Sequence, residues 1–144
     1  MRIRTTALAA AAVTAAAVGL APSAAADTVT TTEPLPWSLN LQTASGSGAS
    51  AWTTVTREDG HTLSQTLTVD GTLTNTGSGC YSAVVAEFVF GFPSGMRDAG
   101  RICGPGTVPV HYRGPAINAS LYLCAVAPGG GCTKMAGPAS VYRR

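Results

Sequence analysis

Two histidines, His61 and His111, are the only side chains of the sequence that could activate a serine nucleophile as a general base. His61 follows the turn signal Asp59-Gly60, and His111 has the parity of a surface position on a short strand. Neither lies in a hydrolase, zinc-protease, phosphate-loop or dinucleotide-binding motif. We therefore expect no catalytic, cofactor-binding or metal-binding residues and no enzyme. A small hydrolase using these histidines is the less favoured alternative.

Carboxylates are the other groups that could perform chemistry, because a glycosidase needs only one suitably spaced pair. The chain has seven Asp and Glu residues, and most fall in predicted turns or termini. Glu87 alone lies within an otherwise apolar run, so we expect it to face solvent or to pair with an arginine. Asp98, between Arg97 and Arg101, is interpreted as part of a solvated loop cluster.

Four cysteines, Cys80, Cys103, Cys124 and Cys132, allow three disulfide pairings. Glycines 129–131 follow Pro128 midway between the last two, and the first two flank residues 91–92, so each pair would close a hairpin. We favour Cys80 with Cys103 and Cys124 with Cys132. A metal site is disfavoured because the sequence has no C-x-x-C motif and no histidine at ligand spacing from a cysteine.

The first 26 residues have the pattern of a cleaved signal peptide, which would place the protein outside the cell. Two arginines precede a 14-residue apolar stretch, and the segment ends in Ala24-Ala25-Ala26. A helix of that length spans about 21 Å, too short for a bilayer core of about 30 Å. No second run of spanning length follows, so we expect no transmembrane segment in the mature chain.

The charge balance after this leader argues against a nucleic-acid partner. Of nine Lys and Arg residues, Arg2 and Arg4 lie in the leader, so the other seven balance seven Asp and Glu. The alanine-rich leader resembles those of high-GC actinomycetes such as Streptomyces, and the chain resembles small exported β proteins of these bacteria.

The elements that must position these groups are strands. Residues 61–76 alternate apolar with threonine or serine, whereas residues 80–90 are apolar on both parities, as expected at the centre of a two-layer core. Further strand-like runs cover 107–113, 116–126 and 139–143. Gly71 suggests a bulge, and Trp37 and Trp52 are expected to cap the edge of the core.

The predicted fold is all-β, an antiparallel β-sandwich, Ig-like or a partly open barrel, with about seven short strands. Residues 27–50 are expected to form an extended arm, ending in a flexible connector at 44–50 with the sequence ASGSGAS. Alternation of Trp37 with Leu39 and Leu41 could add one edge strand. The sandwich domain is then 51–144.

Two families of secreted inhibitors share short segments with this chain. Residues 132–142, CTKMAGPASVY, resemble the end of the Streptomyces subtilisin inhibitors. That resemblance implies a reactive loop after Cys103, at Gly104, Pro105, Gly106, Thr107 and Val108, and a Cys103–Cys132 bridge. Residues 27–34 and 123–129 resemble tendamistat-type amylase inhibitors, although the Trp-Arg-Tyr triplet of that family is absent.

Two functions follow as expectations. The favoured one is a secreted, non-catalytic β-sandwich that binds an extracellular protein, glycan or envelope component. The alternative is a secreted inhibitor of an extracellular protease or glycosidase, for which residues 104–108 would form the inhibitory or binding loop.

Overall fold

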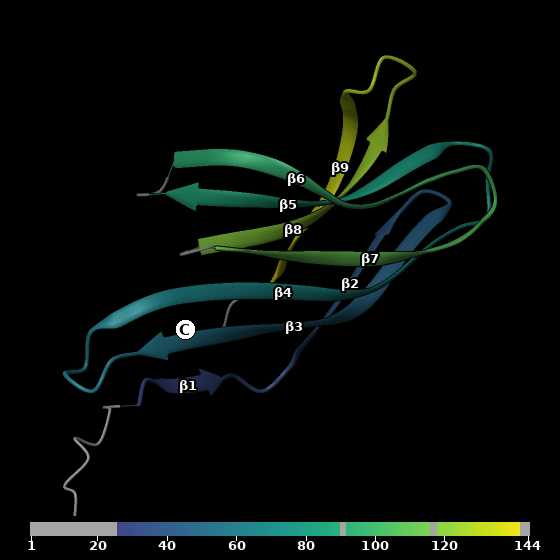
Figure 1. Ribbon diagram of the computed structural model, residues 1–144. Helices are drawn as coiled ribbons and strands as arrows, with labels where there is room; N and C mark the ends of the chain where they lie inside the picture. Colours follow the sequence, from purple (N-terminus) through teal and green to yellow (C-terminus); the bar gives the residue numbers. More distant parts are fainter. Residues whose placement is uncertain (1–25, 90–91, 116–117, 142–144) are drawn as a thin grey trace, which may run out of the picture.

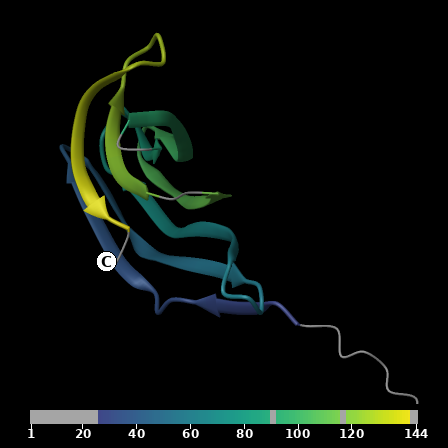
Figure 2. The ribbon, with the colours of Figure 1, turned by 90° about the vertical axis from the view of Figure 1, so that its left-hand side faces the viewer.

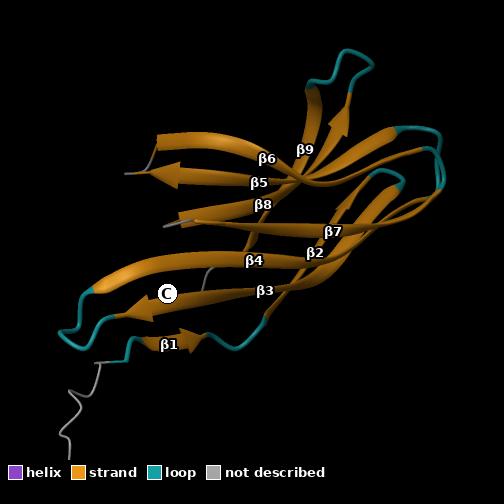
Figure 3. Cartoon of the chain, in the orientation of Figure 1, coloured by secondary structure: helices purple, strands orange, loops and turns teal. Residues whose placement is uncertain are grey.

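The computed structural model describes residues 26–89, 92–115 and 118–141, and every regular element among them is a strand (Figures 1 and 3). The predicted leader lies outside the described residues except for Ala26, and so does the tail 142–144. The strands are β1 (Thr28–Thr31), β2 (Leu35–Leu41), β3 (Ala44–Thr56), β4 (Thr62–Asn75), β5 (Cys80–Val89), β6 (Phe92–Cys103), β7 (Gly106–Pro115), β8 (Asn118–Val126) and β9 (Cys132–Ser140).

The strands form two open antiparallel sheets, which confirms the predicted β-sandwich. Sheet A has the order β1-β3-β4-β7, and β2 also pairs with β3 beyond the end of β1. Sheet B has the order β6-β5-β8-β9. Figures 1 and 2 show both sheets strongly curved, with the β8–β9 hairpin projecting beyond the rest of sheet B.

The core lies between the sheets and follows the alternation of the strands. In β4, Leu67, Val69 and Leu73 are fully buried, while the intervening threonines face outward. Trp37 and Trp52 are also buried, from β2 and β3. The last described residue, Val141, is fully buried, and its carbonyl oxygen accepts a hydrogen bond from Trp52 Nε1 at 2.8 Å.

The expectation of a flexible connector at 44–50 is wrong. These residues form the first half of β3, paired with β2 on one side and β4 on the other. Glycine is required here by packing, because a Cβ on Gly71 would lie 2.6 Å from Trp37 Cζ2 and one on Gly48 would lie 2.0 Å from the Asp70 carbonyl oxygen. Gly71 therefore makes room for a ring, and β4 has no bulge there.

The expected loop around Asp98 is also wrong, because 92–103 form β6 at the edge of sheet B. Its proline, glycines and charges are compatible with an edge strand, where few ladder hydrogen bonds are required. The pairing of β5 with β6 is irregular after Ala83 and after Glu87. Because of these irregularities, residues 92–103 do not show the regular alternation by which a strand is recognised in a sequence.

Both predicted disulfides are present. Cys80 and Cys103 are direct partners in the β5–β6 ladder. Cys132 faces Val126 and not Cys124, so the second bridge runs diagonally across the β8–β9 hairpin, with a Cα–Cα distance of 5.6 Å. Neither bond joins the two sheets, so each stabilises a hairpin within sheet B.

Candidate functional site

Strand β5 presents apolar or small side chains on both faces, although only one face packs against sheet A. Tyr81, Ala83 and Val85 belong to the core between the sheets. By alternation, Ser82, Val84 and Ala86 point to the outer face of sheet B. All three are nevertheless only 1–4% exposed. Neighbouring side chains therefore cover these residues, and a hollow lies beside them on the outer face of sheet B.

The hollow on this outer face has a volume of about 470 Å³, within the range of small-molecule sites. Its apolar part is built from Val84, Met96 and Val126 together with the Cys124–Cys132 bridge. Its polar part comes from Ser82 and from Asp98 and Arg101 of β6. The lining residues are Ser82, Val84, Met96, Arg97, Asp98, Arg101, Cys124, Val126, Gly130 and Cys132. We call this site the outer hollow.

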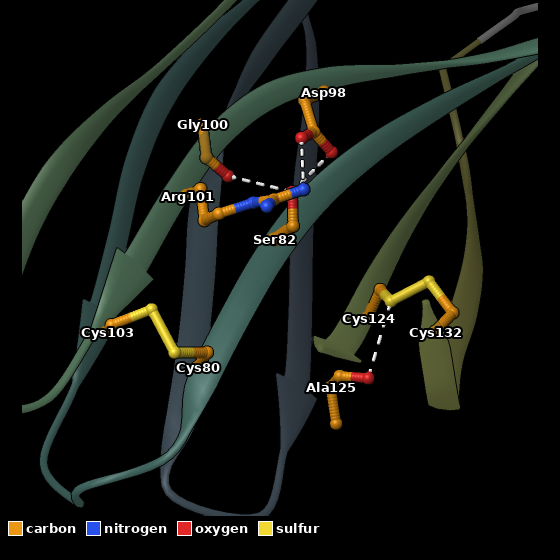
Figure 4. A network of polar contacts seen from close by, with 9 residues as sticks. All are labelled: Cys80, Ser82, Asp98, Gly100, Arg101, Cys103, Cys124, Ala125 and Cys132. Carbon is orange, nitrogen blue, oxygen red and sulfur yellow. Dashed lines mark hydrogen bonds and ion pairs between the residues drawn. A yellow bond between two sulfur atoms is a disulfide. The ribbon is translucent and has the colours of Figure 1, made fainter. Parts of the chain in front are cut away.

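A short polar network holds one side of the outer hollow (Figure 4). The buried Ser82 hydroxyl donates to Asp98 Oδ1 at 2.7 Å and also lies 3.3 Å from the Gly100 carbonyl oxygen. Arg101 Nη2 donates to Asp98 Oδ2 at 2.5 Å. Both oxygens of the carboxylate are therefore occupied. Asp98 thus links Ser82 to Arg101; the pair with Arg101 is about half exposed, so the predicted solvated cluster is present, but on a strand and not in a loop.

Arg97 differs from Arg101 in its orientation, because it is the ladder partner of the core residue Val85 and therefore points to the inner side of sheet B. Among the described residues it makes no hydrogen bond and no ion pair. Residue 97 borders the outer hollow, but its side chain is directed to a groove of about 410 Å³ beside β7. Its guanidinium therefore lies with Glu87 and Tyr112, where its positive charge acts on the Tyr112 hydroxyl.

Glu87 borders that groove and bonds to a tyrosine, where the sequence suggested solvent or an arginine. It is half-buried, and its Oε1 accepts a hydrogen bond from the Tyr112 hydroxyl across the gap between the sheets. Burial, the hydrogen bond and the negative charge of Glu87 together raise the pKa of Tyr112 to about 12, although the charge of Arg97 acts in the opposite direction. The hydrogen bond between Tyr112 and Glu87 therefore links β7 to β5.

The two histidines are exposed, as the sequence predicted. His61 follows the β3–β4 turn, where its backbone N–H donates to Asp59 Oδ1 at 3.0 Å. His111 Nδ1 lies 2.6 Å from Asp70 Oδ1, its direct neighbour on β4. Among the described residues no hydroxyl or thiol group hydrogen-bonds to either imidazole ring. The arrangement supplies no activated nucleophile at either position.

Of the expected inhibitory loop, only Gly104 and Pro105 form a turn. Gly106, Thr107 and Val108 belong to β7 and pair with β4. The turn is tied down as well: the buried Asn75 side chain donates to the Gly104 carbonyl oxygen at 2.8 Å, and the Gly104 N–H donates to the Gly79 carbonyl oxygen at 3.0 Å. This segment does not project as a separate loop.

A further depression, of about 430 Å³, lies beside Trp52 in sheet A, and Glu33, Thr54 and Gln65 are among its lining residues. The indole N–H of Trp52 is already bound to the Val141 carbonyl oxygen, and so is the Ser50 hydroxyl at 3.3 Å. These hydrogen bonds hold the residue after β9 against sheet A. We interpret the depression as the edge of this contact between the C-terminal end of β9 and sheet A.

Sequence reasoning missed the outer hollow, although one signal could have revealed it. The run from 80 to 90 was apolar on both parities, but a two-layer sandwich covers only one face of each strand. The second apolar face, around Val84, therefore needed its own explanation. Asp98 and Arg101 follow from the predicted Cys80–Cys103 hairpin, which places the strand that contains them beside β5.

Comparisons with known proteins give no match to any family model, curated protein or solved structure. Within the described parts of the chain, no cluster of three or more His, Cys, Asp or Glu side chains could hold a metal ion. In those same parts no helix has the length and apolarity needed to cross a membrane. The local geometry alone therefore carries the functional argument.

Proposed function

We propose that the protein is an exported, non-catalytic binding module that takes a small, largely apolar ligand into the outer hollow. The observation that carries the proposal is the hollow of about 470 Å³ on the outer face of sheet B, whose lining includes the apolar residues Val84, Met96 and Val126. Apolar surface left in a concave site with a few polar groups is the usual composition of a ligand site. The signal-like leader and the two disulfides support export.

Binding is favoured over catalysis because neither histidine is joined to a nucleophile among the described residues. Inhibition of a protease or glycosidase, the alternative from the sequence, receives little support. The resemblance to subtilisin inhibitors implied a Cys103–Cys132 bridge, whereas Cys103 pairs with Cys80. Residues 106–108 lie in a paired strand and cannot enter a protease cleft as an extended loop.

The test uses the neutral fluorophore N-phenyl-1-naphthylamine, which becomes bright in apolar surroundings. We expect saturable binding to the wild-type protein. Met96 is 58% exposed and lines the hollow, so Met96→Glu should fold normally and weaken binding at least about tenfold.

The matched control is Leu63→Glu, which changes an apolar residue of similar exposure, 45%, on β4 of the other sheet. Its affinity should equal that of the wild type. Absence of saturable binding to the wild type, or equal losses in the two variants, would contradict the proposal. Circular dichroism of each variant verifies that the fold is retained.

A further inference from the structure

We infer that the ligand of the outer hollow is an uncharged amphiphile whose polar end is a carbonyl oxygen, of a ketone, ester or amide, that accepts a hydrogen bond from Arg101. This inference rests on the proposed function and specifies the chemical class of the ligand. Three features of the outer hollow carry it: its charge balance, the unused donors of Arg101 and the apolar wall beside them.

The charges that face the outer hollow balance each other. In the β5–β6 ladder, Asp98 lies opposite Val84 and points to the outer face of sheet B. Arg101, opposite Ser82, shares this face, whereas Arg97 points to the inner side. The two outward charges form an ion pair at 2.5 Å. A charged ligand would therefore lose its hydration without finding a free partner of opposite charge, a cost that an uncharged ligand avoids.

The hydrogen-bonding capacity that remains in the outer hollow is mainly that of Arg101 as a donor. Its Nη2 bonds to Asp98, and among the described residues its guanidinium makes no other hydrogen bond. A guanidinium has five N–H donors and no acceptor, so several donors are left for a ligand. Each carboxylate oxygen of Asp98 already accepts one bond, from Ser82 or from Arg101. A carbonyl oxygen therefore fits the site better than the hydroxyl groups of a sugar, which would also need acceptors.

The donors of Arg101 are accessible and lie beside an apolar wall. The side chain of Arg101 is 46% exposed. Figure 4 shows it extending from β6 across β5, over Ser82, on the side of the sheet that carries the Cys124–Cys132 bridge. This bridge and Val84 line the same hollow and offer apolar contact. The arrangement matches a ligand with one polar end and an apolar body.

Competition among three compounds with chains of similar length tests the inference. Octan-2-one, octanoate and octyltrimethylammonium differ in the charge of the polar end. Each is titrated against bound N-phenyl-1-naphthylamine, whose fluorescence falls on displacement. We expect octan-2-one to displace the probe at a concentration at least about fivefold lower than either charged compound. Added sodium chloride should leave the affinity for the ketone unchanged.

Arg101→Met removes the guanidinium donors and keeps an unbranched apolar side chain. This variant should weaken the binding of octan-2-one at least about fivefold more than it weakens the binding of N-phenyl-1-naphthylamine. The matched control is Arg113→Met, because Arg113 is an exposed β7 arginine that does not line the outer hollow. The control should keep the preference for the ketone. Circular dichroism of both variants verifies that the fold is retained.

The outcomes separate the inference from the proposed function. If the probe binds and either charged compound displaces it as well as octan-2-one does, the ligand class is wrong while the proposed function stands. The same conclusion follows if Arg101→Met and Arg113→Met weaken the binding of the ketone equally. If the probe shows no saturable binding to the wild type, the proposed function fails, and the inference fails with it.

Discussion

At the residue scale, glycines of sheet A leave the space that the Trp37 ring fills. The ring of Trp37 on β2 reaches across the neighbouring strands, where a Cβ on Gly46 would lie 3.2 Å from its Cζ3 and one on Gly71 would lie 2.6 Å from its Cζ2. The glycines thus allow a large indole to be buried inside the sandwich, where it removes much apolar surface from water.

Gly71→Ala should therefore lower the free energy of unfolding by at least about 2 kcal/mol, because the new methyl group also meets the Ser47 carbonyl oxygen at 2.2 Å. Urea denaturation monitored by tryptophan fluorescence measures the change. Gly129→Ala is the control, since its added Cβ has no neighbour within 4 Å and should alter stability by less than about 0.5 kcal/mol. Equal stability of the two variants would refute the packing explanation.

Tyr112 gives a pH-dependent prediction. Its pKa is raised from 10.0 to about 12 in the folded protein, chiefly by burial and then by the hydrogen bond to Glu87, so the folded state holds the phenolic proton more tightly than the unfolded state. The resulting stabilisation is complete below pH 10 and is lost as the pH rises toward 12. The loss is of order 2 kcal/mol.

Denaturant unfolding of wild type and Tyr112→Phe between pH 8 and 12 measures this effect. Over the upper part of the range the variant should lose less stability than the wild type, because it has no phenol at this position. Parallel pH dependence in the two proteins would show that the tie between Tyr112 and Glu87 does not hold the proton.

At the element scale, the strands differ in how far the sequence predicts them. β4 and β5 were predicted because their apolar periodicity is strong, and both hairpin disulfides followed from cysteines placed around turn residues. The first half of β3 was missed because Ser, Gly and Ala carry no apolar period, and its role is to accommodate Trp37. β6 was missed because an edge strand tolerates Pro93 and three charged residues.

The site was predicted less well than the fold, and β5 shows why. Its two apolar faces were visible in the sequence, but which face meets sheet A depends on strand order. Asp98 and Arg101 were correctly seen as neighbours in the chain. Their hydrogen-bonded link to Ser82 depends on the pairing of β5 and β6, which the predicted Cys80–Cys103 hairpin implied but the interpretation of Asp98 as a loop residue obscured.

The two disulfides should separate stability from binding. Replacing Cys124 and Cys132 together by alanine should cost about 2 to 3 kcal/mol and also weaken N-phenyl-1-naphthylamine binding, because this bridge lines the outer hollow. The Cys80–Cys103 bridge closes a longer loop, so the double Cys80→Ala, Cys103→Ala variant should lose about 3 kcal/mol of folding stability. This variant should nevertheless retain binding when it is folded. Equal binding by both double variants would exclude a role for the bridge in the site.

At the scale of the whole molecule, the facing surfaces of two curved sheets form the core (Figure 2), and the outer hollow lies on the outside of sheet B. The outer face of sheet A is instead a row of threonines with the exposed Asp70–His111 pair. The two faces are thus chemically distinct, because the outer face of sheet B carries a hollow lined partly by apolar side chains.

The proposed export of the chain predicts the mass of the secreted product. Expression in a bacterial host with the leader intact should release a protein that begins at Asp27 and lacks the four hydrogens removed by two disulfides. Intact mass spectrometry of the culture medium measures both features. Retention in the cytoplasm with the leader still attached would contradict the proposed export.

The most direct test of the central claim is a titration of the isotope-labelled protein with N-phenyl-1-naphthylamine, followed by two-dimensional amide and methyl NMR spectra. The outer hollow predicts shifts confined to β5, β6 and the β8–β9 hairpin, with Val84, Met96 and Val126 among the most affected residues. Shifts centred on Trp52 and Gln65 in the other depression, or no saturable shifts at all, would contradict the account.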